Sequence, residues 1–132
     1  MIFAVNLFRQ GCLSQRDFDT YCALYHSLVE FLPAPDLVIY LRASTRTLQT
    51  RIARRNRQYE RVIDPDYLDS LNSLYEQWIA GFSLCPVLAV PADDLDYVSD
   101  PRALELITRK VQQKLSGKEE VVFYQNELPP AL

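Results

Sequence analysis

Hydrophobic and polar positions are spaced along the chain in a way that predicts helices separated by two short strands. A short apolar segment, residues 2–8, opens the chain, and its pattern does not decide between helix and strand. Apolar residues then recur at helical spacing from 18 to 32 and stop at Pro33. Ser14 and Asp17 resemble a capping box at the start of this segment. A helix is therefore expected between Ser14 and Pro33.

Two continuous apolar runs of strand length, 37–41 and 87–90, predict two strands. Runs without alternation are typical of strands covered on both faces, which favours a parallel sheet. Helices are expected after Ser44, Asp64 and Asp100, because each of these residues can cap a following helical pattern. The order strand, helix, helix, strand, helix predicts an α/β fold with a right-handed crossover.

The composition fits one soluble domain. The chain has 132 residues, 48% of them hydrophobic, which is enough for a buried core. Its apolar runs fall far short of the roughly 20 residues that cross a bilayer, and the N-terminus does not have the pattern of a signal peptide. We therefore expect a cytoplasmic protein with no membrane partner. The cysteines indicate neither a disulfide framework nor a zinc site, and buried or half-buried thiols are expected. They are Cys12, Cys22 and Cys85.

Arginine is concentrated in one segment. Residues 46–61 contain six arginines and one acid, Glu60, so this segment carries +5 and the rest of the chain −8, which together give the net charge of −3. A guanidinium cluster on an otherwise acidic protein indicates a local anion site and no nucleic-acid surface. Arg51 and Arg55 lie one helical turn apart and Arg57 follows, so their planar forks can converge on a triphosphate. The alternative is a solvated helix face.

Four segments in collinear order carry a family resemblance. They are the run 2–7, the strand 36–41, the R-x-x-x-R-x-R-x-x-E pattern at 51–60 and the helix that runs from Tyr67 to Trp78. Together they resemble the deoxynucleoside kinase family, especially its bacterial members, over about residues 2–115. The resemblance implies transfer of a phosphoryl group from ATP, with Mg²⁺, to the 5′-hydroxyl of a deoxynucleoside in nucleotide salvage. It also implies a P-loop kinase fold with a parallel sheet and flanking helices.

The resemblance implies a division of the chain and roles on the donor side. Residues 1–115 are expected to be the C-terminal part of a single kinase-like domain with a lid at about 51–61, followed by a loosely held tail, 116–132. Arg55 and Arg57 resemble catalytic lid arginines that grip the donor phosphates and stabilise charge in the transition state. Arg51 resembles the lid arginine that lies against the donor base. The remaining donor residues, in the loop expected along the donor adenine, are Asp93 and Asp94 with Ala92. Ordinary turn chemistry would account for these acids equally well.

On the acceptor side the resemblance implies two residues. Phe3 resembles the aromatic that stacks on the acceptor base, and Glu60 resembles the carboxylate that accepts a hydrogen bond from the sugar 3′-hydroxyl. The alternatives are a core aromatic and an exposed acid. The expected partners are a deoxynucleoside and a nucleoside triphosphate, and a homodimer is expected. The preferred base is not predicted.

The chain departs from the family in two ways. Asn56 stands where the family usually has glycine, although asparagine tolerates a left-handed backbone better than most residues. No G-x-x-x-x-G-K-[ST] motif occurs, since the Gly117-Lys118 pair has Gln112 and Glu119 at the flanking motif positions. We therefore expect that the chain alone is inactive and that an apolar sheet edge beside 37–41 is uncovered. Alternatives are a non-catalytic nucleotide-binding module and a structural subunit that pairs with a complete kinase chain.

Overall fold

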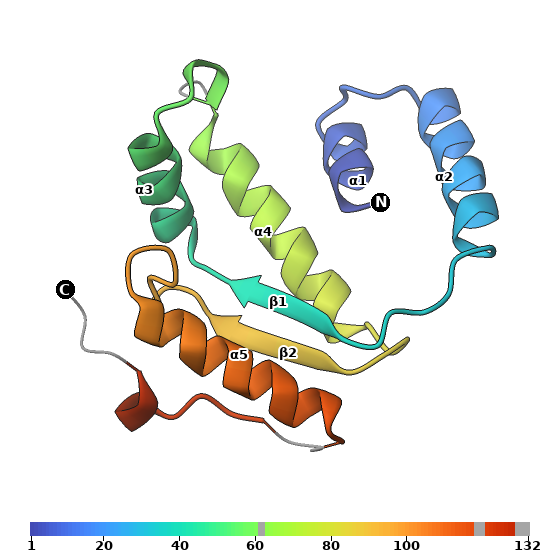
Figure 1. Ribbon diagram of the computed structural model, residues 1–132. Coiled ribbons are helices and arrows are strands. Elements are labelled where there is room, and N and C mark those ends of the chain that lie inside the picture. Colours follow the sequence, from blue (N-terminus) through green and yellow to red (C-terminus); the bar gives the residue numbers. More distant parts are fainter. Residues whose placement is uncertain (61–62, 118–120, 129–132) are drawn as a thin grey trace. The chain divides into compact units, whose positions relative to one another are not determined.

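The computed structural model describes residues 1–60, 63–117 and 121–128, and it shows an α/β chain (Figure 1). The chain divides into two compact units. The helical unit comprises Met1–Ala34 and Arg51–Phe82, and the sheet unit comprises Pro35–Thr50 and Ser83–Leu132. The predicted order of strand, helix, helix, strand, helix is confirmed. The elements are α1 (Ile2–Arg9), α2 (Gln15–Val29), β1 (Val38–Arg42), α3 (Thr45–Arg55), η1 (Gln58–Glu60), α4 (Pro65–Ala80), β2 (Val87–Pro91), α5 (Pro101–Leu115) and η2 (Gln125–Glu127).

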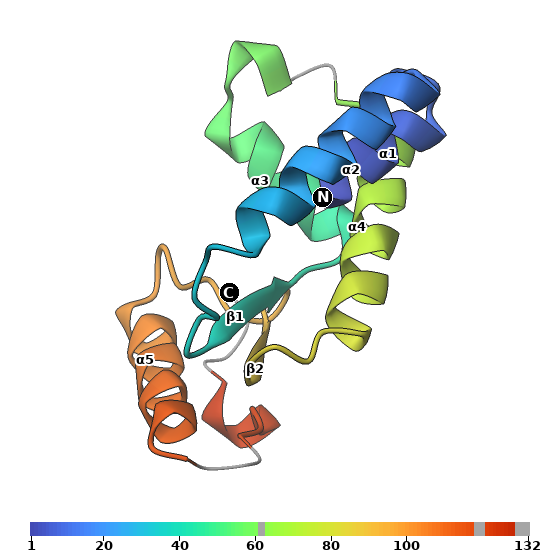
Figure 2. The same cartoon turned by 90° about the vertical axis from the view of Figure 1, so that its right-hand side faces the viewer.

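In the helical unit, α1 lies between α2 and α4 (Figures 1 and 2). The segment whose pattern left its structure open is thus a helix, in which Ala4 and Asn6 are buried and Phe8 reaches α2. The ring of Phe8 stacks on that of Phe18 at 4.4 Å between centroids. Packing against two helices therefore decides a segment that the sequence pattern alone left undecided.

The helix starts follow the predicted capping residues. The Asp17 backbone N–H donates to Ser14 Oγ at 3.2 Å at the start of α2, as the capping-box pattern predicts. Asp64 accepts from the Asp66 N–H at 2.9 Å at the start of α4, where proline occupies the first turn. Asp100 caps α5 in the same way. These three caps satisfy backbone donors that the first helical turn leaves unpaired.

The sheet unit is built on two parallel strands, and the predicted parallel pairing is confirmed. Val38 pairs with Val87 and Arg42 with Pro91, and α5 lies along β2 (Figure 1). The core under β2 consists of Leu88, Val90, Leu95, Ala103, Leu106 and Ile107. The prediction that both faces of the strands are covered is wrong, since Ile39 is 46% and Leu41 is 45% exposed on β1, and Ala89 is exposed on β2. Helix α5 packs on β2 and leaves the apolar side chains of β1 partly exposed to solvent. This exposure agrees with the uncovered apolar surface that was expected beside 37–41.

The described part of the C-terminal tail packs on the core, which differs from the expectation of a loosely held tail. Val121, Phe123 and Leu128 lie against the core cluster. Lys110 of α5 is only 5% exposed, and its Nζ donates to both carboxylate oxygens of Glu127 at 2.7 and 3.0 Å. A buried ammonium must be paired, and this pair supplies the partner that holds the tail in place. Residues 118–120 and 129–132 of the predicted tail lie outside the described residues.

Two further expectations concern the cysteines and the membrane. All three cysteines are free thiols, and Cys22 and Cys85 are half-buried as expected. Cys12 is exposed, so the expectation of burial is wrong there, because it lies in the loop between α1 and α2. Within the described residues, no helix combines the length and the apolar character needed to span a bilayer.

Candidate functional site

The segment predicted to be the lid, 51–61, begins within α3 and continues past its end. Arg55 is the last residue of α3, and Asn56 follows with φ of 53°, which is the left-handed region. Asparagine adopts this conformation more readily than most residues with a Cβ, so it can hold this turn. The backbone then turns through η1, where the Glu60 N–H donates to the Arg57 carbonyl at 3.0 Å. The turn returns the side chain of Glu60 to the end of α3, and position 61, the last of the predicted lid, lies outside the described residues.

The turn brings three of the predicted site residues into one ionic cluster. Arg55 holds the Glu60 carboxylate with two groups, because its Nε donates to Oε2 at 2.9 Å and its Nη2 lies 2.6 Å from Oε1. Arg57 Nη1 lies 3.6 Å from the same Oε1. The Glu60 side chain is 9% exposed, whereas those of Arg55 and Arg57 are 50% and 52% exposed. We call this set, Arg55, Arg57 and Glu60, the lid cluster.

The lid cluster differs from the two alternative interpretations, an exposed acid at Glu60 and a fully solvated face of arginines. Glu60 is buried among arginines, so it is not the exposed acid of the alternative interpretation. Arg55 and Arg57 present about half of their side chains to solvent while they contact the carboxylate. Arg51 lies one turn earlier on α3 and is half-buried. The cluster is thus a surface of two cations that share one internal anion.

Phe3 lies elsewhere in the helical unit, on α1. Its side chain is 53% exposed, so it is not a core aromatic. Its ring meets that of Tyr75 on α4 edge to face, with centroids 6.2 Å apart and planes at 84°. Trp78 continues this aromatic row at 6.5 Å from Tyr75. An aromatic ring that is fixed on one side and half exposed is suited to stack on a planar ligand.

Sequence reasoning missed Asn6, which is fully buried on α1 one turn after Phe3. Its Oδ1 accepts from Ser70 Oγ of α4 at 2.6 Å, and its Nδ2 has no partner among the described residues. The clue in the sequence is an amide side chain inside an otherwise apolar segment. The Asn6–Ser70 bond fixes α1 against α4 and with it the position of Phe3.

In the sheet unit, the two acids predicted for the donor loop differ in what they contact. Asp93, in the loop after β2, accepts from the Ser44 N–H at 2.9 and 3.1 Å and from Ser44 Oγ at 3.1 Å. Ser44 Oγ in turn accepts from the Thr47 N–H at 3.2 Å at the start of α3. Asp94 is exposed, and within the described residues its side chain makes no hydrogen bond. Asp93 therefore ties the loop after β2 to the N-terminus of α3.

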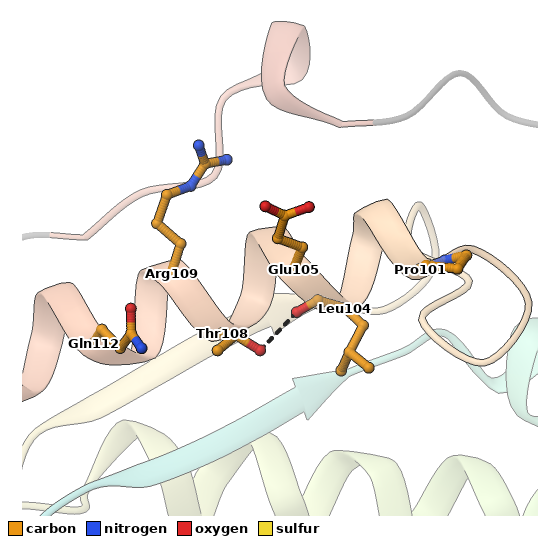
Figure 3. A pocket seen from close by; sticks show the side chains of 6 residues that line it. All are labelled: Pro101, Leu104, Glu105, Thr108, Arg109 and Gln112. Atoms are coloured by element: carbon orange, nitrogen blue, oxygen red, sulfur yellow. Dashed lines mark hydrogen bonds between the residues drawn. The ribbon is translucent and has the colours of Figure 1, made fainter.

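A shallow depression of about 490 Å³ lies on the outer face of α5 (Figure 3). Its lining includes Glu105, Arg109 and Thr108, and the Thr108 hydroxyl donates to the Leu104 carbonyl at 2.9 Å. None of the predicted site residues lines it. Among residues 1–60, 63–117 and 121–128, no group of three or more His, Cys, Asp or Glu side chains is arranged to hold a metal ion.

Comparison with known proteins gives the family. The deoxynucleoside kinase family model matches residues 1–116. The deoxyadenosine/deoxycytidine kinase of Bacillus subtilis is 33% identical over 112 residues, which are 83% of this chain and 52% of that protein. The deoxyguanosine kinase of the same organism is 34% identical over 116 residues, 85% of this chain and 56% of that protein. A solved structure of deoxyadenosine kinase from M. mycoides with bound dCTP has a TM-score of 0.69 at 33% identity, covering 85% of this chain and 58% of that one.

The chain therefore belongs to the deoxynucleoside kinase family, and its α/β architecture is that of its structural neighbours. It spans about half the length of the curated relatives that it matches.

Proposed function

We propose that this chain supplies the lid and part of the acceptor site of a deoxynucleoside kinase, which transfers a phosphoryl group from ATP to the 5′-hydroxyl of a deoxynucleoside in nucleotide salvage. The observation that carries the proposal is the lid cluster, in which two half-exposed guanidinium groups lie beside one buried carboxylate. Family membership over residues 1–116 supports it.

On the donor side, Arg55 and Arg57 bind the phosphates of the nucleoside triphosphate. Phosphoryl transfer places negative charge on the transferred group, and catalysis depends mainly on positioning and on fixed positive charge. Planar guanidinium groups match phosphate oxygens in pairs, which a lysine does not achieve. Arg51 contributes its planar group toward the donor base. Mg²⁺ bound with ATP would neutralise further phosphate charge in such an enzyme.

The donor loop has a structural part and a binding part in this proposal. Asp93 holds the start of α3 through Ser44. Asp94 is exposed beside it and borders the donor base. The loop contributes mainly through its backbone, and for this reason an acid in it can be engaged in capping.

On the acceptor side, Phe3 stacks on the base and Glu60 accepts a hydrogen bond from the sugar hydroxyl. The half-exposed ring of Phe3 and its edge contact with Tyr75 support the first role. For the second role Glu60 must become accessible, because its side chain is 9% exposed in the lid cluster.

A second candidate is pairing with another chain, either a second copy or a complete kinase chain. Its support is the apolar surface of α2, where large hydrophobic side chains are exposed and none is buried among the described residues. They include Tyr21, Leu24, Leu28 and Val29, and the exposed Phe31 and Leu32 follow directly after the helix. In this candidate the arginines bind nucleotide without transfer. Phosphorylation of deoxynucleosides by the isolated chain, at a turnover of about 1 to 1000 per second, would exclude it and also contradict the expected inactivity.

Triphosphate binding tests the proposal directly. Isothermal titration of the 132-residue chain with ATP should show binding that weakens as salt rises. Arg55→Ala and Arg57→Ala should each weaken it by about 1.5 to 3 kcal/mol, about tenfold or more, because each removes charge-assisted hydrogen bonds. Arg16→Ala, which removes an exposed arginine from α2, is the matched control and should have little effect. Equal affinities in all four proteins would leave the solvated-face interpretation as the better one.

A further inference from the structure

The lid cluster contains its own anion. Arg55 offers Nε and Nη2 to the two oxygens of Glu60, which is the same side-on fork that it would offer to two phosphate oxygens. Arg57 approaches the same carboxylate at 3.6 Å. The edge of Arg55 that is best suited to a phosphate is therefore occupied by a side chain five residues further along the chain.

Burial makes this occupation more than a surface ion pair. The Glu60 side chain is 9% exposed, so its negative charge depends on the two arginines for compensation. An exposed pair would exchange its partners with water at little cost. In the lid cluster, withdrawal of Arg55 leaves a buried carboxylate that has to turn toward solvent or find a new donor. Binding of a ligand to Arg55 and the position of Glu60 are thus linked.

We infer that Glu60 is an internal counter-anion of the lid: it competes with polyphosphate for Arg55, and polyphosphate binding releases its carboxylate. This inference rests on the proposed function, since it concerns the same donor site. The residues involved lie within one short segment, and the left-handed turn at Asn56 is where its backbone changes direction. Exchange of partners therefore needs only a local change after the end of α3.

The sign of the effect follows from charge. A triphosphate carries several negative charges at neutral pH, and a carboxylate in contact with both arginines repels it as well as occupying their donors. Glu60 also orders Arg55, which by itself would favour binding, but ordering one side chain is a smaller effect than a fixed like charge in contact with the binding groups. Removing the charge of Glu60 should therefore strengthen polyphosphate binding.

A consequence for the proposed reaction is coupling between the two substrates. If Glu60 is released when the donor phosphates bind, its carboxylate becomes available to the acceptor sugar only in that state. Linkage then requires that the acceptor strengthens donor binding by the same factor. One carboxylate would in this way make the acceptor site sensitive to occupation of the donor site.

The test compares charge removal at two positions. Inorganic tripolyphosphate is titrated into the wild-type chain, Glu60→Gln and Glu30→Gln, the last of which removes the same charge from an exposed position at the end of α2. Glu60→Gln should bind about 3- to 10-fold more tightly than wild type, which is the range expected for loss of a competing ion pair whose arginine is half exposed. Glu30→Gln should stay within about twofold, because distant exposed charges are screened. Unchanged or weaker binding by Glu60→Gln would overturn the inference.

A second measurement uses the wild-type chain and does not depend on how the variants fold. The Nε–H resonance of Arg55 in ¹⁵N–¹H spectra reports its bond to Glu60, and it should shift on saturation with tripolyphosphate as the partner changes. A resonance unchanged at saturation would overturn the inference while leaving the donor site in place. Failure of tripolyphosphate to bind any of the proteins would instead refute the proposed function, so the two failures are distinguishable.

Discussion

Asp93 offers the sharpest test of how the N-terminus of α3 is stabilised. Its carboxylate accepts hydrogen bonds from two groups of Ser44, the backbone N–H at 2.9 Å and Oγ at 3.1 Å. These bonds join the loop after β2 to the first turn of α3, where the backbone donors have no helical partner. A negative charge at this end also interacts favourably with the helix dipole. Asp93→Ala removes all of these contributions together.

The expected loss of stability follows from these contacts. Hydrogen bonds to a charged acceptor contribute about 1.5 to 3 kcal/mol when buried, and the helix-end charge about 0.3 to 1 kcal/mol. Asp93 is exposed, so water replaces part of each bond, and we expect a loss of about 1 to 2 kcal/mol. Asp93→Asn keeps an acceptor and loses the charge, so about half of that loss is expected. Asp94→Ala is the matched control, with an expected change within about 0.5 kcal/mol.

Urea unfolding followed by circular dichroism measures these differences. With a slope of about 2 kcal/mol/M, Asp93→Ala should lower the midpoint by roughly 0.5 to 1 M while Asp94→Ala leaves it nearly unchanged. Equal midpoints for the two variants would refute the capping argument. Weakened triphosphate binding by Asp93→Ala at unchanged stability would do so as well, because Asp93 would then act on the ligand and not on α3.

Two further predictions concern the turn at Asn56 and the ion pair that holds the C-terminal tail. Asn56→Gly should leave the unfolding midpoint nearly unchanged, whereas Asn56→Ala should lower the free energy of unfolding by about 1 kcal/mol, because φ of 53° is strained for alanine. A larger loss in the glycine variant than in the alanine variant would contradict this reasoning. Hydrogen bonds from the Lys110 ammonium and then from the Tyr124 N–H hold the pKa of Glu127 below its usual value of 4.5. The stability that this pair contributes should thus be present above about pH 4.5 and lost as pH falls through the folded-state pKa. The free energies of unfolding of wild type and Glu127→Gln should therefore differ at neutral pH and converge in acid. A difference that does not depend on pH would show that the carboxylate charge is not the cause.

The local structure of the chain was largely predictable from sequence. Caps such as Ser14 and Asp64 act within a few residues, and apolar spacing reports directly which face of a helix is buried. The two strands were recognisable because short continuous apolar runs next to prolines are typical of buried strands. The arginine pattern and its family resemblance identified Arg55, Arg57 and Glu60 as a set, since all three lie within one short segment.

Contacts between distant segments were decided by tertiary structure alone. The first apolar segment became α1 because two helices pack on it, and no local pattern distinguishes that from a strand. Asp93 caps α3 through Ser44, which lies 49 positions earlier in the chain. No local sequence pattern shows a contact over that separation. The docking of the tail through Lys110 and Glu127 likewise depends on a pair 17 positions apart.

The sequence by itself determined where arginine side chains are concentrated, because residue type and helical spacing decide where guanidinium groups can gather. Only the folded chain decided that Glu60 is held by those same groups. The physical reason is the turn at Asn56, whose positive φ sends the backbone back on itself and places an acid against the arginines. A periodic pattern predicts which residues share a helix face, but it does not predict the direction that the chain takes after the helix ends.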